Sequence, residues 1–296
     1  MGTDAVILDA TTAEVEFVAG SSGNDVLTAV GGVTGVTFYG GEGNDQLIGG
    51  DGNDVLVGQA GGDILTGGVG HDVLNGAEGE DILVGESGND MVYGGTGSDQ
   101  ISGGDGDDTI SGDDGADWIF GGGGGDYLSG GDGDDVMSGD EGNDTLVGHT
   151  GDDTIAGGVG NDYLAGGTGN DVYVFTRGDE ADTISEVDVT AGNTDRLAFG
   201  TAINPLDLIL SRQANDLRLA IRGTSDQVAI ENWYLGDEHH VETIQAGNGQ
   251  ALLNTQVDQL IHAMAAFTEQ TGLTWDQAVD QRPQDVQPSW RRVGNR

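Results

Sequence analysis

The chain has 296 residues, and its 52 acidic side chains against nine basic ones give a formal net charge of −43 at pH 7. All nine basic residues are arginines and the first is Arg177, so the N-terminal 176 residues carry 34 acidic side chains and no basic one. A negative field of this size repels nucleic acids and anionic membrane surfaces and attracts cations, so we expect no nucleic-acid partner. The absence of cysteine excludes disulfides and thiolate metal sites.

The sequence also bears on how the chain meets a membrane. No apolar run approaches the roughly 18 residues of a transmembrane helix, so we expect no membrane insertion. Residues 1–4 begin the chain without a basic n-region or a long apolar stretch, which is not the pattern of a cleavable signal peptide. If the protein is exported, its address is expected elsewhere in the chain.

Residues 1–39 are predicted to form an N-terminal cap and an irregular first coil. Two short β-type stretches, 5–8 and 15–18, combine apolar and β-branched residues. One copy of a nine-residue unit follows at 20–28, and residues 29–39 then break its period.

Residues 40–174 repeat the nine-residue unit G-x-x-G-x-D-x-U-x without a break in fifteen copies, where U is a large apolar residue. Position 8, from Leu47 to Tyr173, predicts a three-residue strand that points one side chain into a core. Positions 1 to 6 are expected to form the turn, because glycine adopts positive φ without steric cost. Position 5 is mostly Asn, Asp or Gly, as at Asn44 and Asp107, and we expect left-handed backbone there.

Two repeats are expected to make one coil of eighteen residues, so that repeat n stacks on repeat n+2 at about 4.8 Å. The position-6 aspartates then form two ladders. The first contains Asp45, Asp63, Asp81, Asp99, Asp117, Asp135, Asp153 and Asp171. The second contains Asp54, Asp72, Asp90, Asp108, Asp126, Asp144 and Asp162. Carboxylates stacked this closely cannot all be buried and ionised unless a cation lies between them.

These fifteen aspartates are the predicted metal ligands. Carboxylate oxygens and turn carbonyls form an all-oxygen cage that suits Ca²⁺ better than Mg²⁺, and zinc would require His or Cys. One ion between each stacked pair gives about thirteen Ca²⁺ sites. Fifteen buried apolar side chains cannot by themselves offset the conformational entropy of so glycine-rich a segment. We therefore expect the array to be unfolded without calcium and to fold cooperatively on binding it.

Residues 175–250 are predicted to form a β-rich C-terminal capping domain that closes the array. Alternating apolar residues indicate strands at 197–199, 206–210, 217–221 and 228–230.

Residues 251–296 are predicted to form a helical tail. Val257, Leu260, Ile261, Met264 and Phe267 share one helical face. Thr255 with Asp258 indicates a capping-box start for this helix, and Gly272 indicates its end. A shorter helix capped by Thr274 is expected to stop at Pro283. Residues 284–296 are expected to be unstructured.

The array resembles the repeats-in-toxin (RTX) family of haemolysin-type calcium-binding proteins, which Gram-negative bacteria secrete by a type I route. The match covers 40–174 in full and 20–28 loosely. Residues 195–199 through 232–234 resemble the related domain that often follows such arrays. The resemblance implies an all-β fold, a parallel β-roll capped by the C-terminal domain, with the position-6 aspartates as calcium ligands. It also implies an uncleaved C-terminal secretion signal, here within residues 251–296.

The first functional hypothesis is a calcium-binding module of a secreted, extracellular protein that folds on extracellular calcium and so supports export. Its implied partners are the ABC transporter, adaptor and outer-membrane channel of a type I secretion apparatus. The alternatives are a rigid structural or adhesive spacer, or the C-terminal fragment of a larger RTX toxin, adhesin or hydrolase. No H-E-x-x-H, G-x-S-x-G or phosphate-loop motif is present, so we expect no catalytic residues and no enzymatic activity in this chain.

Overall fold

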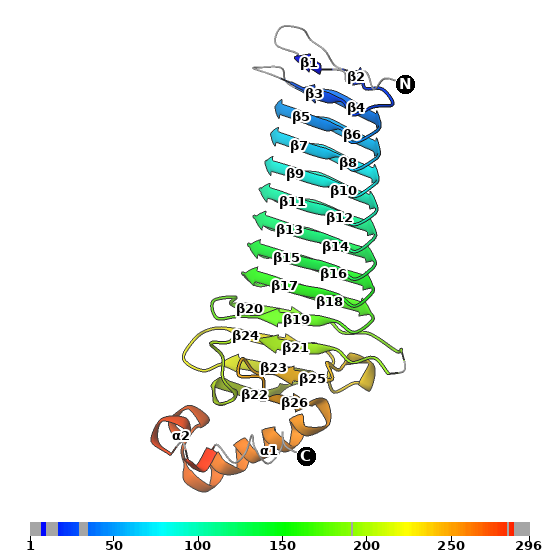
Figure 1. Ribbon diagram of the computed structural model, residues 1–296. Coiled ribbons are helices and arrows are strands. Elements are labelled where there is room, and N and C mark those ends of the chain that lie inside the picture. The colour runs from blue at the N-terminus through cyan, green and yellow to red at the C-terminus, as the bar shows by residue number, and fades with distance from the viewer. Residues whose placement is uncertain (1–6, 10–16, 30–34, 191, 283, 287–296) are drawn as a thin grey trace.

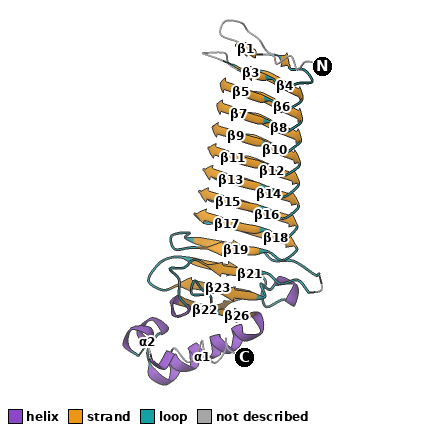
Figure 2. Cartoon of the chain, in the orientation of Figure 1, coloured by secondary structure: helices purple, strands orange, loops and turns teal. Residues whose placement is uncertain are grey.

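The computed structural model describes residues 7–9, 17–29, 35–190, 192–282 and 284–286 (Figure 1). In it the chain winds into a parallel β-roll made of two thirteen-stranded sheets, and successive strands alternate between the sheets from β1 to β22. The strands stack as a straight column with the helices gathered at its C-terminal end (Figures 1 and 2). The predicted all-β class and parallel β-roll are confirmed.

The first sheet contains the odd-numbered strands as far as β21, followed by β25 and β26. Its order is β1 (Ile7–Asp9), β3 (Val26–Thr28), β5 (Gln46–Asp51), β7 (Ile64–Val69), β9 (Ile82–Ser87), β11 (Gln100–Asp105), β13 (Trp118–Gly123), β15 (Val136–Glu141), β17 (Thr154–Val159), β19 (Val172–Phe175), β21 (Arg196–Phe199), β25 (Thr243–Gln245) and β26 (Ala251–Leu253). All neighbours are parallel except β25 and β26.

The second sheet contains the even-numbered strands and ends in an antiparallel meander. Its order is β2 (Val18–Ala19), β4 (Thr37–Glu42), β6 (Val55–Ala60), β8 (Val73–Glu78), β10 (Met91–Thr96), β12 (Thr109–Asp114), β14 (Tyr127–Asp132), β16 (Thr145–Thr150), β18 (Tyr163–Thr168), β20 (Ala181–Ile184), β24 (Gln227–Ile230), β23 (Asp216–Ile221) and β22 (Leu208–Gln213). The parallel pairing therefore continues beyond the repeats, from β20 to β24, and the antiparallel strands β23 and β22 complete the sheet.

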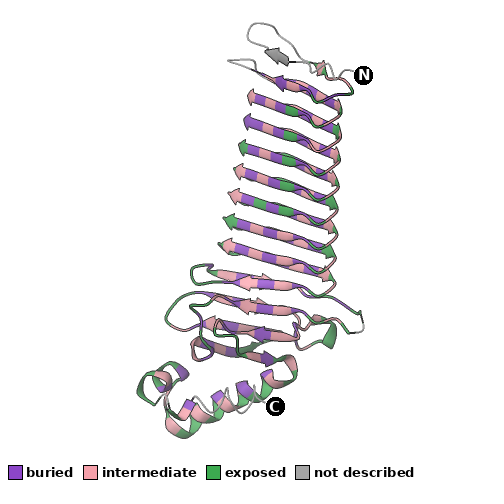
Figure 3. Cartoon of the chain, in the orientation of Figure 1, coloured by how far each residue is buried: buried purple, intermediate pink, exposed green. Residues whose placement is uncertain are grey.

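The eighteen-residue coil is confirmed by the strand register, since Leu47 pairs with Leu65 and Leu65 with Leu83. The position-8 side chains are all buried and form two stacks of apolar residues, one on each sheet. Figure 3 shows how buried and more exposed residues alternate along the strands. The position-8 residues are Leu47, Leu56, Leu65, Leu74, Leu83, Val92, Ile101, Ile110, Ile119, Leu128, Met137, Leu146, Ile155, Leu164 and Tyr173. Because each repeat buries one such side chain, the apolar core is narrow along the whole array.

The strands of the array are longer than predicted. From β5 to β18 each spans six residues, from position 7 of one repeat to position 3 of the next, as Gln46–Asp51 does in β5, and only the last, β19, is shorter at four. Only positions 4 to 6 form the turn. Positive φ occurs at positions 2 and 4, as at Gly50 (95°) and Gly52 (108°), and not at position 5. The predicted left-handed backbone at position 5 is therefore wrong.

Position 5 has a different role, which the stacking explains. The side-chain oxygen of Asn53 accepts a hydrogen bond from the main-chain N–H of His71, one coil further on, at 3.0 Å. Asp107 accepts from Gly125 in the same way at 2.9 Å. Asn and Asp are suited to this position because a short side chain can satisfy a turn amide of the next coil.

The strands predicted at 197–199, 217–221 and 228–230 are confirmed as β21, β23 and β24. The one predicted at 206–210 is only partly right, since a 3₁₀ turn, Pro205–Asp207, precedes β22. At the N-terminus, β1 and β2 overlap the two predicted stretches; of their other residues, Phe17 precedes β2 outside any strand, and residues 5, 6, 15 and 16 lie outside the described part of the chain.

Helix α1 (Asn254–Thr271) packs on the end of the roll and buries Val257, Leu260 and Met264. It begins earlier than predicted, because Leu253 is the N-cap and the Leu253 N–H donates to Gln256 Oε1 at 3.1 Å. The expected end at Gly272 is confirmed, with φ of 71°.

Helix α2 (Trp275–Gln281) begins at the expected cap, Thr274, whose side chain accepts from Gln277 N. The predicted stop at Pro283 lies outside the described residues. Residues 284–286 form a helical turn that buries Val286, so the expectation of no structure is wrong for these three; residues 287–296 are not described. Within the described chain, every helix is too short or too polar to span a membrane.

Candidate metal centre

The position-6 aspartates stand at the turn before each strand, where the coil geometry aligns them along the column. One carboxylate oxygen, Oδ1, accepts a hydrogen bond from the main-chain N–H of the aspartate one coil earlier. The Asp45 N–H donates to Asp63 Oδ1 at 2.7 Å, and the Asp99 N–H donates to Asp117 Oδ1 at 2.8 Å. The same contact recurs along both ladders, so the structure places all fifteen predicted residues in the predicted ladders. Their role as calcium ligands stays a prediction.

The other carboxylate oxygen, Oδ2, is buried and has no hydrogen-bond partner within the described part of the chain. This holds for all fifteen aspartates of the array: Asp45, Asp54, Asp63, Asp72, Asp81, Asp90, Asp99, Asp108, Asp117, Asp126, Asp135, Asp144, Asp153, Asp162 and Asp171. Each is at most 3% exposed. A buried carboxylate oxygen without a partner is strongly unfavourable, and its repetition in every coil indicates a missing ligand rather than a local irregularity.

The glycine at position 1 shows where this oxygen points. A Cβ added to Gly112 would lie 2.2 Å from Asp117 Oδ2 and 2.7 Å from the carbonyl oxygen of Gly130. At Gly58 the corresponding distances, to Asp63 Oδ2 and to the Gly76 carbonyl, are 2.2 and 2.9 Å. Glycine is required here because any side chain would fill the space on which a carboxylate and a carbonyl oxygen converge.

The electrostatics of the ladders are unfavourable without a counter-charge. Burial, together with repulsion from the neighbouring aspartates of the ladder, raises the pKa of Asp63, Asp108 and Asp117 to about 7. Hydrogen bonds from the main chain oppose this shift without cancelling it. At neutral pH the ladders therefore need either protons or cations.

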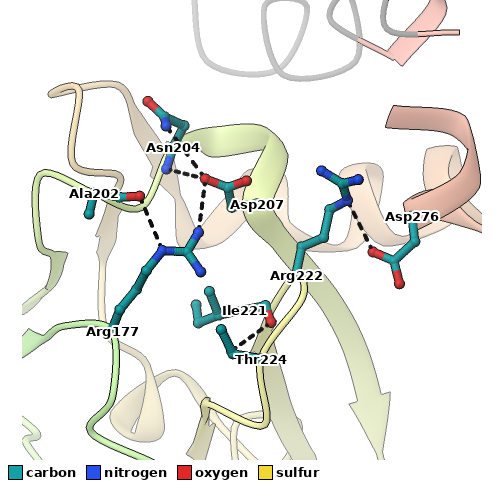
Figure 4. Close-up of polar contacts among 8 residues, drawn as sticks. All are labelled: Arg177, Ala202, Asn204, Asp207, Ile221, Arg222, Thr224 and Asp276. Carbon is teal, nitrogen blue, oxygen red and sulfur yellow. Dashed lines mark hydrogen bonds and ion pairs between the residues drawn. The ribbon is translucent and has the colours of Figure 1, made fainter. Parts of the chain in front are cut away.

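The basic side chains of the described chain are not placed to supply that charge. Arg177 pairs with Asp207 at 3.3 Å and donates to the Ala202 carbonyl, and Arg222 pairs with Asp276 at 3.4 Å (Figure 4). These contacts fasten the β22–β23 region to the end of the roll and to α2. Every arginine ion pair of the described residues lies in this C-terminal part, away from the ladders.

The donor set therefore fits a hard divalent cation. The converging atoms are carboxylate and carbonyl oxygens, the ligands of Ca²⁺, and neither His nor Cys is among them. The histidine pair in the C-terminal part serves elsewhere, since the rings of His239 and His240 contact the carbonyl oxygens of Glu186 and Trp233.

The ladders extend further than the repeats do. The Asp25 N–H donates to Asp45 Oδ1 at 2.7 Å at the N-terminal end. At the other end, the Asp162 N–H donates to Asp182 Oδ1 at 3.1 Å and the Asp171 N–H to Asp195 Oδ1 at 2.8 Å.

Sequence reasoning missed these added rungs, although a signal was present. Asp182, Asp195 and Glu242 each stand two residues before a buried apolar residue, which preserves positions 6 and 8 of the unit without its glycines. The Asp195 N–H donates to Glu242 Oε2 at 2.9 Å, so Glu242 is the last rung of the first ladder. Insertions of unequal length between these rungs conceal the period.

Known families contain the same unit. The RTX calcium-binding nonapeptide repeat (4 copies) matches this sequence in eight overlapping windows that together run from residue 39 to residue 173. The chain belongs to the RTX family. The haemolysin-type calcium binding protein related domain matches residues 216–249, which include β23, β24 and β25. The RTX repeats of this chain are therefore structural calcium-binding modules.

A solved structure shows a partial likeness. The chain is similar to the extracellular lipase LipA from Serratia marcescens, with 23% identity across 52% of this chain and 38% of the lipase chain, and a TM-score of 0.24. The similarity thus spans well under half of the lipase. No activity is assigned to the RTX chain from it.

Proposed function

We propose that this RTX chain is a calcium-folded module of a protein exported by a type I secretion system. In this proposal the chain leaves the cell unfolded through the ABC transporter, adaptor and outer-membrane channel. Extracellular calcium then folds the roll outside and so favours completed export. The observation that carries the proposal is the set of fifteen buried aspartates in two ladders, each with one oxygen that has no hydrogen-bond partner among the described residues.

The proposed stoichiometry follows from the ladders. One ion between each stacked pair gives about thirteen sites in the array, and the rungs Asp25 and Asp182 each add one stacked pair. In each site an aspartate carboxylate and a position-1 glycine carbonyl would supply oxygen ligands, and the bound ion would supply the positive charge that the ladder lacks. Sites in extracellular modules typically bind calcium at about 0.1–1 mM, so the low calcium inside a cell would leave the ladders uncompensated.

The C-terminal region would carry the export signal, within residues 251–296. In the folded protein Val257, Leu260 and Met264 of α1 are buried against the end of the roll. This apolar face is accessible only while α1 is undocked. Recognition by the transporter would therefore precede folding, which agrees with a roll that folds only when it binds calcium.

The test is far-UV circular dichroism of the whole chain, first in EDTA and then in millimolar calcium. We expect a disordered spectrum in EDTA and a cooperative gain of β-structure on adding calcium, with magnesium at the same concentration giving little. A β-structured sample in EDTA at pH 7.5 would contradict calcium-dependent folding. The export half is tested separately, by secretion of the intact chain and of a chain that ends at residue 250 from cells carrying a type I system. Equal secretion of the two chains would contradict the placement of the export signal within residues 251–296.

A further inference from the structure

A second kind of acidic site lies at the junction between the last repeat and the C-terminal strands. It is formed by Asp171 before β19, Glu186 after β20 and Asp195 before β21, and we call it the junction site. One oxygen from each of the three side chains lies within 4.8 Å of the other two. Each side chain is at most 1% exposed. Glu186 belongs to neither ladder and comes from the loop that joins β20 to β21.

The hydrogen bonds around the junction site leave specific oxygens without partners. Asp195 Oδ1 accepts from the Asp171 N–H at 2.8 Å, and Asp195 Oδ2 accepts from Asn193 Nδ2 at 2.6 Å. Glu186 Oε2 accepts from the Tyr173 hydroxyl at 2.5 Å. Asp171 Oδ2 and Glu186 Oε1 remain, and neither has a hydrogen-bond partner among the described residues. A buried glutamate oxygen without a partner inside an acidic cluster is a separate indication of a ligand.

Tyr173 explains how Glu186 is held. It is the position-8 residue of the last repeat and the one aromatic residue at that position in the array. Its ring fills the core, while its hydroxyl accepts from the Gly166 N–H at 2.7 Å and donates to Glu186. An aliphatic residue would fill the same core position and leave the glutamate without an orienting donor. Tyr173 is thus a positioning residue for the carboxylate.

Among the described residues, no arginine forms an ion pair with the junction site. The arginine ion pairs of the described chain involve Asp207, Asp276, Asp280 and Asp285. Three buried carboxylates whose oxygens lie this close repel one another, and they persist together only if a cation or protons join them. A cation would bind the two oxygens that have no hydrogen-bond partner and would draw the β20–β21 loop onto the last repeat. Protonation would remove charge from the cluster, but it does not explain why these two oxygens are left without partners.

We propose that the junction site binds one calcium ion, held by Asp171, Glu186 and Asp195, and that this ion fastens the C-terminal strands to the repeat array. Its ligand set includes a glutamate from outside the repeating unit, so it is a site of a different kind from those between stacked repeats. The preference for calcium over magnesium rests on the same oxygen chemistry as the proposed function, whereas the site does not depend on export. In this arrangement the C-terminal region orders at its own calcium concentration, read separately from that of the array.

Hydrogen exchange followed by mass spectrometry on the whole chain, across a calcium titration at pH 7.5, separates the two events. Peptides within 181–199 report on the junction, and peptides within 82–105 report on the array. The variants are Glu186→Gln, Tyr173→Phe, and Glu269→Gln as a control with the same chemical change at an exposed position of α1. We expect Glu186→Gln to raise the calcium concentration for half-protection of the junction peptides about tenfold or more, while the array peptides keep their midpoint. Glu269→Gln should match the unchanged chain.

The substitution Glu186→Gln also distinguishes calcium from a proton, because glutamine resembles protonated glutamate. If a proton joins the cluster, Glu186→Gln leaves the junction as protected as before, or more so, and independent of calcium; that result overturns the proposal. If Glu186→Gln prevents folding altogether, Tyr173→Phe decides, since it keeps every charge and removes only the orienting hydroxyl. A junction midpoint raised about tenfold in Tyr173→Phe supports the site, and an unchanged midpoint overturns it. If the protection of the array peptides in the unchanged chain does not depend on calcium, that result would instead contradict the proposed function.

Discussion

Two adjacent glycines in one repeat give a matched test of the proposed cation sites. Gly94 is at position 1, and an added Cβ would lie 2.4 Å from Asp99 Oδ2 and 2.7 Å from the Gly112 carbonyl oxygen. Gly95 is at position 2 with φ of 111°. A Cβ added to Gly95 would lie 2.2 Å from the Ala77 carbonyl oxygen, so alanine there must change its φ to relieve a contact with the main chain. The same change to alanine therefore either fills the place where the proposed ligands converge or meets only the main chain of the neighbouring coil.

The two variants should differ in size of effect. In the column of Gly95, alanine is already accommodated at Ala77, with φ of 78°, stacked on Gln59 with φ of 81°. Gly95→Ala should adopt the same φ and lose about 1 kcal/mol of unfolding free energy. Gly94→Ala should lose about 1–3 kcal/mol from overpacking. Loss of one cation at about tenfold above its Kd removes about 1.4 kcal/mol more.

The assay is thermal unfolding of the whole chain in saturating calcium, followed by circular dichroism. For a folded unit of this size, about 1 kcal/mol shifts Tm by roughly 2–4 °C. We therefore expect Gly94→Ala to lower Tm by roughly 5–15 °C and Gly95→Ala by only about 2–4 °C. Equal shifts, or a larger one for Gly95→Ala, would refute the reasoning that position 1 is reserved for ligand oxygens.

Three further predictions concern the ladders and the C-terminal region. Burial raises the pKa of Asp63 and Asp153 to about 7, so the calcium-free roll binds more protons than the unfolded chain between about pH 4 and pH 7. The free energy of unfolding of the calcium-free roll should therefore be highest in acid and fall as pH rises. Circular dichroism in EDTA should show β-structure near pH 4 that is lost by pH 7.5. A roll that in EDTA gains structure as pH rises would contradict this sign. Asp117→Asn should weaken calcium-induced folding yet stabilise the calcium-free roll, because it removes a buried charge, whereas Asp107→Asn, which changes an exposed carboxylate that accepts from Gly125, should do neither in a calcium titration. Leu260→Ala should destabilise the docking of α1 by about 2–5 kcal/mol, seen as faster hydrogen exchange in α1 while the array stays protected; faster exchange throughout the array would show that the helix is integral to the roll.

Much of the array could be predicted from its sequence because one period determines several features together. A spacing of nine residues with two repeats in each coil places Leu47 beside Leu65 and Asp45 beside Asp63 without knowledge of any distant contact. Local backbone was harder. The Asn and Asp residues at position 5 were interpreted through their tolerance of left-handed φ, whereas their side chains bond to the next coil. That role becomes visible only when the stacking is known.

The C-terminal part could be predicted less completely, because its pairings span unequal insertions. Within the array each rung bonds to one eighteen residues away, but the contacts that reach Asp182, Asp195 and Glu242 span 20, 24 and 47 residues. Alternating apolar residues identified three of the strands there. They could not show that β21 and β24 continue the sheets of the roll in parallel, since that depends on which distant strand each one meets.

The two ladders end in different ways, and only the first continues to the start of helix α1. In the second sheet Asp182 pairs with Val228 of β24, so an apolar residue follows the last acidic rung. The first ladder continues through Asp195 to Glu242, whose carbonyl accepts from the Asn254 N–H at 3.0 Å at the start of α1. Since coils in repeat arrays stabilise their neighbours, order induced in the array can reach α1 through the first ladder. The junction site lies on that same ladder, between the last repeat and Glu242, which places its proposed calcium ion between the array and the helix.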